Sequence, residues 1–198
     1  GLGKRTAMVE RDRLGGDCTL YGCIPSKALI RSAAVMQQTG RLDRFGLRAE
    51  GTLSLDTTGV MEHARDAIEK VASTHRAESF ESLGIRVLFG EPRFLDPYRV
   101  QIGDRTLSAR RFILCTGSSP LIPAIDGLQD IRYLTNRTLY SIESLPGSML
   151  ILGAGPIGVE MAAALHRLGV RITLVEQAEG ILARDDKELA DELTDMLR

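Results

Sequence analysis

Two cysteines, Cys18 and Cys23, stand five positions apart and are the residues of this sequence best suited to chemistry. Thiols this close in a chain can interconvert between a disulfide and a dithiol with little movement of the backbone. Pro25 follows them, and proline suits the first turn of a helix because its missing N–H would have no intrahelical partner there. We therefore predict a helix just after the cysteines, over residues 26–38, with its positive end toward the sulfurs.

This predicted helix would make one of the two sulfurs reactive. A helix N-terminus and the cation of Lys27 both favour a thiolate, which is the nucleophilic form of cysteine. A structural disulfide of a secreted protein and half of a zinc site are the alternatives. Both are disfavoured, because no signal peptide opens the chain, only three cysteines occur in it, and zinc ligands usually come as two closely spaced pairs. Redox chemistry is the favoured interpretation, and no metal site is expected.

A second candidate site is the glycine-rich run GAGPIG at residues 153–158, which has the G-x-G-x-x-G spacing. Gly153 permits a tight turn, Gly155 lets the backbone approach a pyrophosphate, and Gly158 allows a helix to pack closely on a strand. The N-terminus of the helix that follows would offer N–H groups and partial positive charge to phosphates. The run therefore predicts a dinucleotide site.

The surroundings of this run support that prediction. We expect a strand over residues 149–152, a helix over 157–168 and a second strand over 170–175 that ends at Glu176. A carboxylate in that place can accept hydrogen bonds from both hydroxyls of an adenosine ribose, and it would repel a 2′-phosphate. The sequence therefore favours NADH over NADPH.

Periodicity and turn signals give the other elements. They are a strand over 5–10, a long helix over 56–83 closed by Gly84, a strand over 85–89, antiparallel strands over 93–95, 99–102 and 106–110, a buried strand over 111–115, and an amphipathic helix over 185–198.

The composition limits how many domains the chain can form and which kinds of partner it can bind. A chain of 198 residues, 43% of them hydrophobic, can bury one core or two small ones. The net charge of −1, with both signs mixed along the chain, predicts no basic surface that would bind a nucleic acid or an anionic membrane. No stretch is apolar over the length that a bilayer requires, and no targeting segment is evident, so we expect a soluble cytoplasmic protein.

The run GGDCTLYGCIPSKAL, residues 15–29, resembles the active-site signature of the flavin-dependent pyridine nucleotide–disulfide oxidoreductases. That family includes dihydrolipoamide dehydrogenase, glutathione reductase, mercuric reductase and the soluble transhydrogenase. The run departs from the best-known members at residues 17–21, where Asp17 stands in place of a threonine. This variant is more similar to the mercuric-reductase-like branch, although such reductases typically use NADPH, in tension with Glu176.

The resemblance implies the cofactors FAD and NAD, with NADP possible. The strand that ends at Glu10 is similar to the second strand of the family's FAD unit, with its carboxylate on a ribose of FAD. Thr116 and Gly117 are similar to a second flavin motif, in which Cys115 replaces the usual alanine and is expected to be small and buried. The implied cofactor-binding residues are Glu10, Gly16, Asp17, Thr116, Gly117, Gly153, Gly155, Gly158 and Glu176.

The resemblance also implies catalytic roles for four residues. Cys23 would be the thiolate beside the flavin, and Cys18 the exchange thiol that meets the substrate. Lys27 would pair with Glu160 next to the flavin, which is physically reasonable because a buried lysine needs a partner charge. Where the family's gating aromatic residue can stand, this chain has Pro156, so we expect no gate.

The predicted fold is α/β, with two Rossmann-like units, both incomplete. Residues 1–120 would form a partial FAD-binding domain that contains the redox-active disulfide, the long helix and a small antiparallel β-meander. Residues 121–147 would be a turn-rich connecting segment, and residues 148–198 a partial NAD(P)-binding domain.

The implied function is that of a fragment of a flavoprotein oxidoreductase with a role in cell redox homeostasis. It would pass electrons from NAD(P)H through FAD to the cysteine pair and on to a small disulfide, a lipoamide-type substrate or Hg(II). The intact parent is expected to be a homodimer, and a His-Glu pair of its dimerisation domain is outside this sequence, so this chain alone should be a poor catalyst. The alternatives are a non-catalytic NAD(H)-binding or redox-sensing module and, less favoured, a zinc-binding module.

Overall fold

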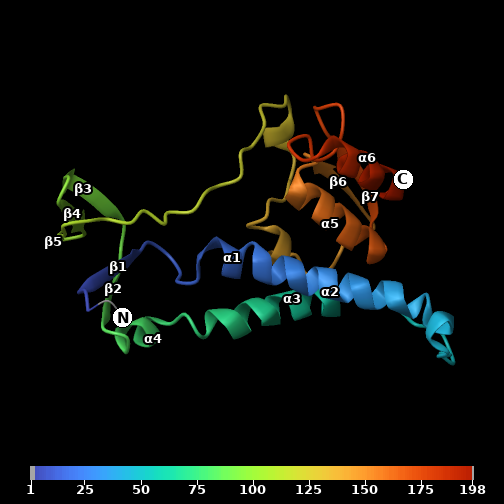
Figure 1. Cartoon of the computed structure of the whole chain (residues 1–198), viewed down its shortest axis with the longest axis horizontal. Helices are drawn as coiled ribbons and strands as arrows, with labels where there is room; N and C mark the ends of the chain where they lie inside the picture. The colour runs from blue at the N-terminus through green and yellow to red at the C-terminus, as the bar shows by residue number, and fades with distance from the viewer. Residues whose placement is uncertain (1–2, 198) are drawn as a thin grey trace. The chain divides into compact units, whose positions relative to one another are not determined.

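The computed structural model describes residues 3–197 as a mixed α/β structure with two compact units (Figure 1). The first unit comprises the residues up to Ile24 together with Ala67–Arg137, and the second comprises Pro25–Asp66 and the residues from Thr138 onward. Each unit contains one pair of parallel strands. The expected α/β class is confirmed, while the domain boundaries after residues 120 and 147 stay predictions.

The parallel pair of the first unit consists of β1 (Thr6–Glu10) and β2 (Ile85–Phe89). The two strands run in register from Thr6 opposite Ile85 to Glu10 opposite Phe89. One more hydrogen bond, from the N–H of Gly90 to the carbonyl oxygen of Glu10 at 2.9 Å, continues the ladder. Both predicted strands are therefore confirmed, and their carboxyl ends meet at one edge.

The predicted meander is also confirmed. It consists of β3 (Pro92–Asp96), β4 (Arg99–Ile102) and β5 (Arg105–Ser108), paired antiparallel in that order. Val100 and Ile102 stand two positions apart in β4 and are both buried. This is expected because every second side chain of a strand lies on the same face of the sheet.

The long helix predicted over residues 56–83 is wrong, because the structure has two helices there, α3 (Thr57–Ala72) and α4 (Ala77–Glu81). After α3 the hydroxyl of Ser73 donates to the carbonyl oxygen of Lys70 at 2.8 Å, and that of Thr74 donates to Val71 at 2.7 Å. Such short polar side chains compete with the backbone for carbonyl groups, and this ends the helix.

The buried strand predicted over residues 111–115 is wrong too. Residues 109–125 contain no assigned strand or helix, and neither β1 nor β2 pairs with them. Ile113 is 89% exposed and Leu114 70% exposed. Cys115, expected to be buried, is also exposed. An apolar run becomes a buried strand only if it pairs with a neighbouring strand under a covering layer, and no strand of the described residues pairs with this run.

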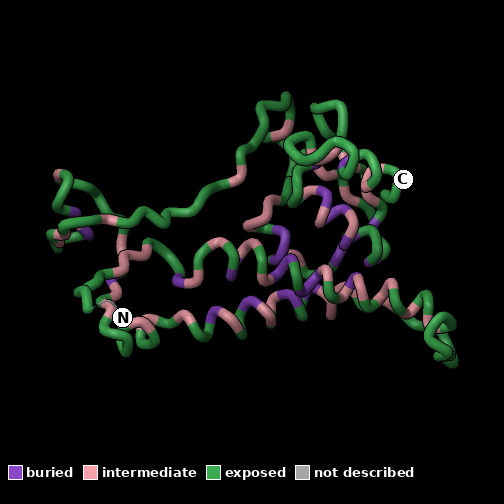
Figure 2. Tube along the Cα trace, in the orientation of Figure 1, coloured by how far each residue is buried: buried purple, intermediate pink, exposed green. Residues whose placement is uncertain are grey.

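Two long helices contribute buried side chains to the second unit. Helix α2 (Cys23–Thr39) buries Leu29 and Ala33, and α3 buries Met61 and Ala64. The buried residues lie along both helices in Figure 2, and complete burial of a side chain the size of Leu29 contributes about 2 kcal/mol. The predicted helix over 26–38 is confirmed but begins earlier, at Cys23.

The rest of the second unit is the predicted strand–helix–strand. β6 (Ser148–Leu152) and β7 (Arg171–Val175) pair in parallel, and α5 (Pro156–Arg167) connects them. Leu165 of α5 is fully buried. A last amphipathic helix, α6 (Lys187–Leu197), follows.

Four short helices complete the described chain: α1 (Gly16–Leu20), η1 (Leu42–Phe45), η2 (Leu128–Asp130) and η3 (Leu139–Ser141). Within residues 3–197, no helix combines the length and the apolar character needed to cross a membrane.

Candidate active site

Cys18 and Cys23 form a disulfide, with their Cα atoms 4.6 Å apart. Cys18 lies in the short helix α1 and Cys23 is the first residue of α2, so the expectation that both precede the helix is corrected. Both cysteines are exposed. Because Cys23 opens a helix of 17 residues, the partial positive charge of that N-terminus stabilises its thiolate.

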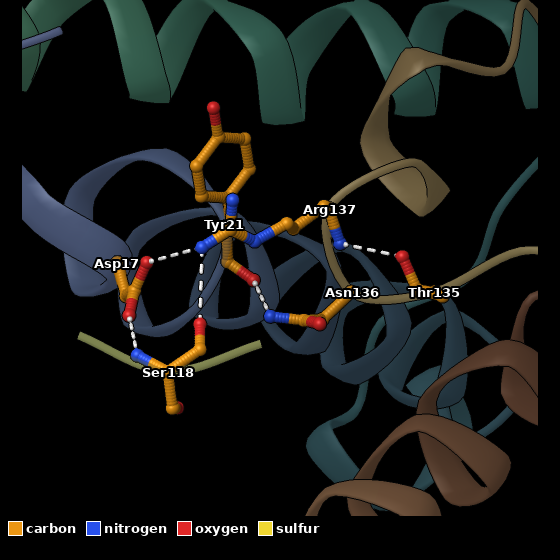
Figure 3. Close-up of polar contacts among 6 residues, drawn as sticks. All are labelled: Asp17, Tyr21, Ser118, Thr135, Asn136 and Arg137. Atoms are coloured by element: carbon orange, nitrogen blue, oxygen red, sulfur yellow. Dashed lines mark hydrogen bonds and ion pairs between the residues drawn. The ribbon is translucent and has the colours of Figure 1, made fainter. Parts of the chain in front are cut away.

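The carboxylate of Asp17, the residue before Cys18, binds the loop predicted to contact the flavin. Its Oδ2 accepts a hydrogen bond from the N–H of Ser118 at 3.2 Å (Figure 3). Gly117 has a φ of +67°, and a Cβ there would lie 2.5 Å from the same carboxylate oxygen. Only glycine therefore allows this approach. The structure thus brings Asp17 and Gly117 together.

Arg137 completes this cluster, and no sequence motif had predicted a role for it. Its Nη2 lies 3.5 Å from Oδ1 of Asp17 and donates to the carbonyl oxygen of Ser118 at 3.0 Å. Its guanidinium carbon lies 5.3 Å from the centre of the Tyr21 ring, within the range of a cation–π contact. Arg137 belongs to no short motif and is 120 positions from Asp17, so no local signal in the sequence could have found it.

Glu10 ends β1 at the edge where the carboxyl ends of the two parallel strands meet. Its Oε1 accepts a hydrogen bond from the N–H of Asp12 at 2.8 Å, which fixes the turn after the strand. This edge is where open α/β sheets bind their ligands, so the placement of Glu10 suits a ribose.

Lys27 and Glu160, both in the second unit, form an ion pair, as the resemblance implied. The side chain of Lys27 is 63% exposed, however, so the expectation of a buried lysine is wrong. Next to Glu160 in space is Tyr140, whose hydroxyl lies 3.9 Å from the sulfur of Met161. Burial, with a smaller contribution from the charge of Glu160, raises the pKa of Tyr140 to about 12.

The glycine-rich turn has the form that a pyrophosphate requires. Gly153 has a φ of +99°, and a Cβ on Gly158 would overlap the carbonyl oxygen of Gly153. Gly155 caps α5 without a side-chain hydrogen bond, and nothing lies within 4 Å of where its Cβ would be. No side chain caps α5 at Gly155, and Pro156 at its first position has no N–H to satisfy; an uncapped helix N-terminus of this kind is compatible with an anion.

Glu176 follows β7 and binds this turn. One oxygen accepts from the N–H of Ala154 at 2.7 Å, and the other accepts from Gln177 at 2.7 Å and Ala178 at 3.0 Å. These hydrogen bonds, that from Ala154 foremost, lower the pKa of Glu176. The carboxylate is therefore charged and oriented at neutral pH. Ala154 and Glu176 line an open pocket of about 650 Å³, which Asp191 of α6 also lines.

Known proteins resemble this chain over nearly its whole length. A mercuric reductase from Bacillus cereus is 28% identical over 99% of this chain and 31% of its own length, and a dihydrolipoyl dehydrogenase from Bacillus subtilis is 34% identical over 100% and 44%. The structure matches that of the HOCl-induced flavoprotein disulfide reductase RclA from Escherichia coli with a TM-score of 0.82, at 24% identity, over 99% of this chain and 42% of the other. The chain thus spans less than half the length of these proteins.

The family model described as pyridine nucleotide-disulphide oxidoreductase matches residues 2–198. The resemblance read from residues 15–29 is thereby confirmed: the chain belongs to the pyridine nucleotide-disulphide oxidoreductase family, whose cofactors are FAD and NAD(P).

Proposed function

We propose that this chain is the electron-transfer portion of a flavoprotein in which the Cys18–Cys23 disulfide accepts the electrons of NAD(P)H. The observation that carries this proposal is the disulfide itself: it is exposed, it joins α1 to the first residue of α2, and it lies in the unit that contains Gly117. FAD and NAD(P)H would supply hydride transfer and the passage of two electrons to the disulfide. The residues of this chain would bind and orient the two cofactors and carry out thiol exchange.

FAD would be held in the first unit. Glu10 would accept hydrogen bonds from its ribose, and the backbone at Gly16 and Thr116 would lie along it. Gly16 and Gly117 both have positive φ values, of +70° and +67°. At Gly16 nothing lies within 4 Å of where a Cβ would be, so the backbone there can approach a ligand, whereas at Gly117 that place faces the carboxylate of Asp17. Asp17 would fix the loop at Gly117 beside the disulfide.

The nicotinamide nucleotide would be held in the second unit. Gly153, Gly155 and Gly158 form the turn for its pyrophosphate, and the free N-terminus of α5 favours the negative charge. Glu176 would accept from the adenosine ribose and would repel a 2′-phosphate, because hydrogen bonds from backbone N–H groups keep it ionised. We therefore propose NADH as the preferred donor.

The two cysteines would have different roles once the disulfide is reduced. Reduction of the disulfide takes up two electrons and, once both thiols form, two protons. Cys23 would be held as the thiolate by the N-terminus of α2, and Cys18 would attack the substrate. With a disulfide substrate, Cys18 forms a mixed disulfide and releases one thiol; Cys23 then displaces the second thiol and restores the Cys18–Cys23 bond. The Lys27–Glu160 ion pair would tune the reactivity of the flavin.

The substrate would be a small disulfide, a lipoamide-type compound or Hg(II). The relatives named above support these classes, since they include a mercuric reductase and a dihydrolipoyl dehydrogenase. We further propose that the whole protein is a cytoplasmic homodimer that acts in cell redox homeostasis.

Replacement of the two cysteines in turn tests the division of labour. In the flavin-loaded protein, Cys18→Ser should abolish substrate reduction but leave reduction of the flavin by NADH at the parent rate. Cys23→Ser should abolish both the disulfide and substrate turnover. Loss of flavin reduction in Cys18→Ser, or substrate turnover by either variant, would show that the assigned roles are wrong.

One observation favours a second candidate, a non-catalytic NAD(H)-binding or redox-sensing module: the glycine-rich turn, Glu176 and the open pocket that Ala154 and Glu176 line all lie in the second unit, whereas the disulfide lies in the first. The colour of the purified chain separates the two. Bound flavin, seen as a yellow protein, supports the enzyme. A colourless protein that still binds NADH supports the module.

A further inference from the structure

Helix α1, which carries Cys18, is too short to be stable by itself. It has five residues, and its N-cap, Gly15, makes no side-chain hydrogen bond. A single helical turn in isolation is unstable, because nucleation fixes several dihedral angles in return for one hydrogen bond. Contacts with other segments must therefore hold α1 where the disulfide needs it.

Side chains tie the N-terminal end of α1 to two distant segments. Asp17 accepts from the N–H of Ser118 at 3.2 Å and pairs with Arg137 at 3.5 Å. Arg137 in turn donates to the carbonyl oxygen of Ser118 at 3.0 Å. We call Asp17, Ser118 and Arg137 the latch (Figure 3). All three residues lie in the first unit, and each contacts the other two.

The C-terminal end of α1 is tied by the same segment. Its C-cap, Tyr21, presents its ring to the guanidinium of Arg137 at 5.3 Å. The side-chain amide of Asn136 donates to the carbonyl oxygen of Tyr21 at 3.5 Å. Two adjacent residues, Asn136 and Arg137, thus reach both ends of the helix.

We propose that Asp17 and Arg137 are positioning residues for the redox pair, and that the latch holds Cys18 beside Cys23 while the disulfide is open. Reduction breaks the covalent link between α1 and α2, but no bond of the latch involves a sulfur atom. The latch therefore persists in the dithiol form and keeps the effective concentration of the two thiols high. This inference rests on the proposed redox role of the cysteine pair.

The latch also balances charge next to Cys18. Asp17 is its neighbour in the chain, and the cation of Arg137 offsets that negative charge. Removal of Arg137 leaves the carboxylate alone, which disfavours a thiolate, whereas removal of the Asp17 charge leaves the cation alone and favours one. The two replacements should therefore move the reactivity of the thiols in opposite directions.

The test is a redox titration of the purified chain in a Cys115→Ser background, so that only the pair titrates. Disulfide and dithiol are equilibrated with oxidised and reduced dithiothreitol, which exchange two electrons and two protons with the pair. Asp17→Asn, Arg137→Gln and Arg137→Lys are compared with the parent. Arg13→Gln is the matched control, because it breaks an exposed ion pair with Glu69 in the same unit. Circular dichroism confirms that each variant is folded.

We expect Asp17→Asn and Arg137→Gln each to shift the equilibrium about fivefold to tenfold toward the dithiol, the loss expected for a charge-assisted contact. The variant with both replacements should shift the redox equilibrium by about as much as the larger of the two single shifts, because both residues act through one contact. Arg13→Gln should match the parent. If Arg137→Gln does not fold, Arg137→Lys, which keeps the charge but not the planar fork, should still show a smaller shift.

The pH profile of alkylation of the reduced pair gives the second reading. Alkylation at a fixed pH should be slower in Arg137→Gln, faster in Asp17→Asn, and close to the parent rate in the double variant. A latch that only stabilises the fold would move both variants in the same direction. Unchanged redox equilibria, additive shifts or an equal shift in the control would overturn the inference. Because dithiothreitol drives the titration, the result does not depend on electron transfer from NADH.

Discussion

Gly158→Ala tests whether the glycine-rich turn is built for close packing of α5 on its strand. A Cβ at this position would overlap the carbonyl oxygen of Gly153, and that peptide cannot rotate freely. The N–H of that peptide belongs to Ala154 and donates to the carboxylate of Glu176 at 2.7 Å, and the N–H of Gly153 donates to the carbonyl oxygen of Val175 at 2.8 Å, so the turn is fixed to the end of β7. The backbone of the turn must therefore move to accommodate the methyl group.

Two opposing terms set the magnitude. Alanine in a helix is favoured over glycine by about 1 kcal/mol. Overpacking costs about 1–3 kcal/mol where side chains can adjust, and more where a backbone carbonyl is in the way. The cost of the overlap exceeds the gain in helix propensity. We therefore expect the free energy of unfolding to fall by about 2 kcal/mol and Tm to fall by about 4–8 °C. The displaced turn should also weaken NADH binding at least tenfold.

Urea and thermal unfolding followed by circular dichroism measure the loss of stability, and NADH titration by calorimetry measures the loss of affinity. Gly147→Ala is the matched control, since it is a glycine of the same unit with nothing within 4 Å of the added Cβ. The control should keep the stability and the affinity of the parent. If Gly158→Ala is as stable as Gly147→Ala, the close packing read from this turn is refuted.

Two further predictions concern ionisable groups. Of the four tyrosines, Tyr140 should ionise last, near pH 12, in a titration followed at 295 nm, and Tyr140→Phe should remove that late step. Since its folded pKa is raised from 10.0, its contribution to stability is complete below pH 10 and is lost as the pH rises to about 12; a protein whose stability does not fall over this window contradicts the assignment. Glu176→Gln should weaken NADH binding about tenfold and narrow the preference over NADPH, because the amide loses the charge and one acceptor oxygen; equal affinities in parent and variant would remove Glu176 from the site. Because the pKa of Glu176 is lowered, its stabilising contribution is present above about pH 4.5 and is lost as the pH falls through the lowered value.

The strand–helix–strand around residues 153–158 could be predicted because every signal for it is local. Glycine spacing, the apolar strands and the acid at 176 all lie within about one supersecondary unit. The same holds for the cysteine pair, whose short separation and following Pro25 place it at a helix N-terminus.

The wrong predictions arose where distant or opposing interactions decide the structure. The apolar periodicity of the long predicted helix continues past Ala72, but the hydroxyls of Ser73 and Thr74 take the carbonyl groups that end α3. The apolar run over residues 111–115 has the composition of a strand, yet a strand also needs a partner, and no strand of the described residues pairs with it.

The latch shows the same limit for the site. Asp17 could be singled out because it departs from a familiar signature, but its partners Ser118 and Arg137 lie more than 100 positions away. Lys27 was paired correctly with Glu160, whereas its exposure could not be read from the sequence, because burial depends on the packing of the whole unit.

The proposed function requires that electrons from NADH reach the Cys18–Cys23 disulfide. This transfer can be measured by counting the thiols that appear when the FAD-loaded Cys115→Ser protein is mixed with NADH without oxygen and then alkylated for mass spectrometry. We expect two new thiols per chain, at positions 18 and 23, and none when FAD is left out. If NADH produces no thiols in the flavin-loaded protein while dithiothreitol releases both, NADH does not reduce the pair through FAD and the proposed function is wrong.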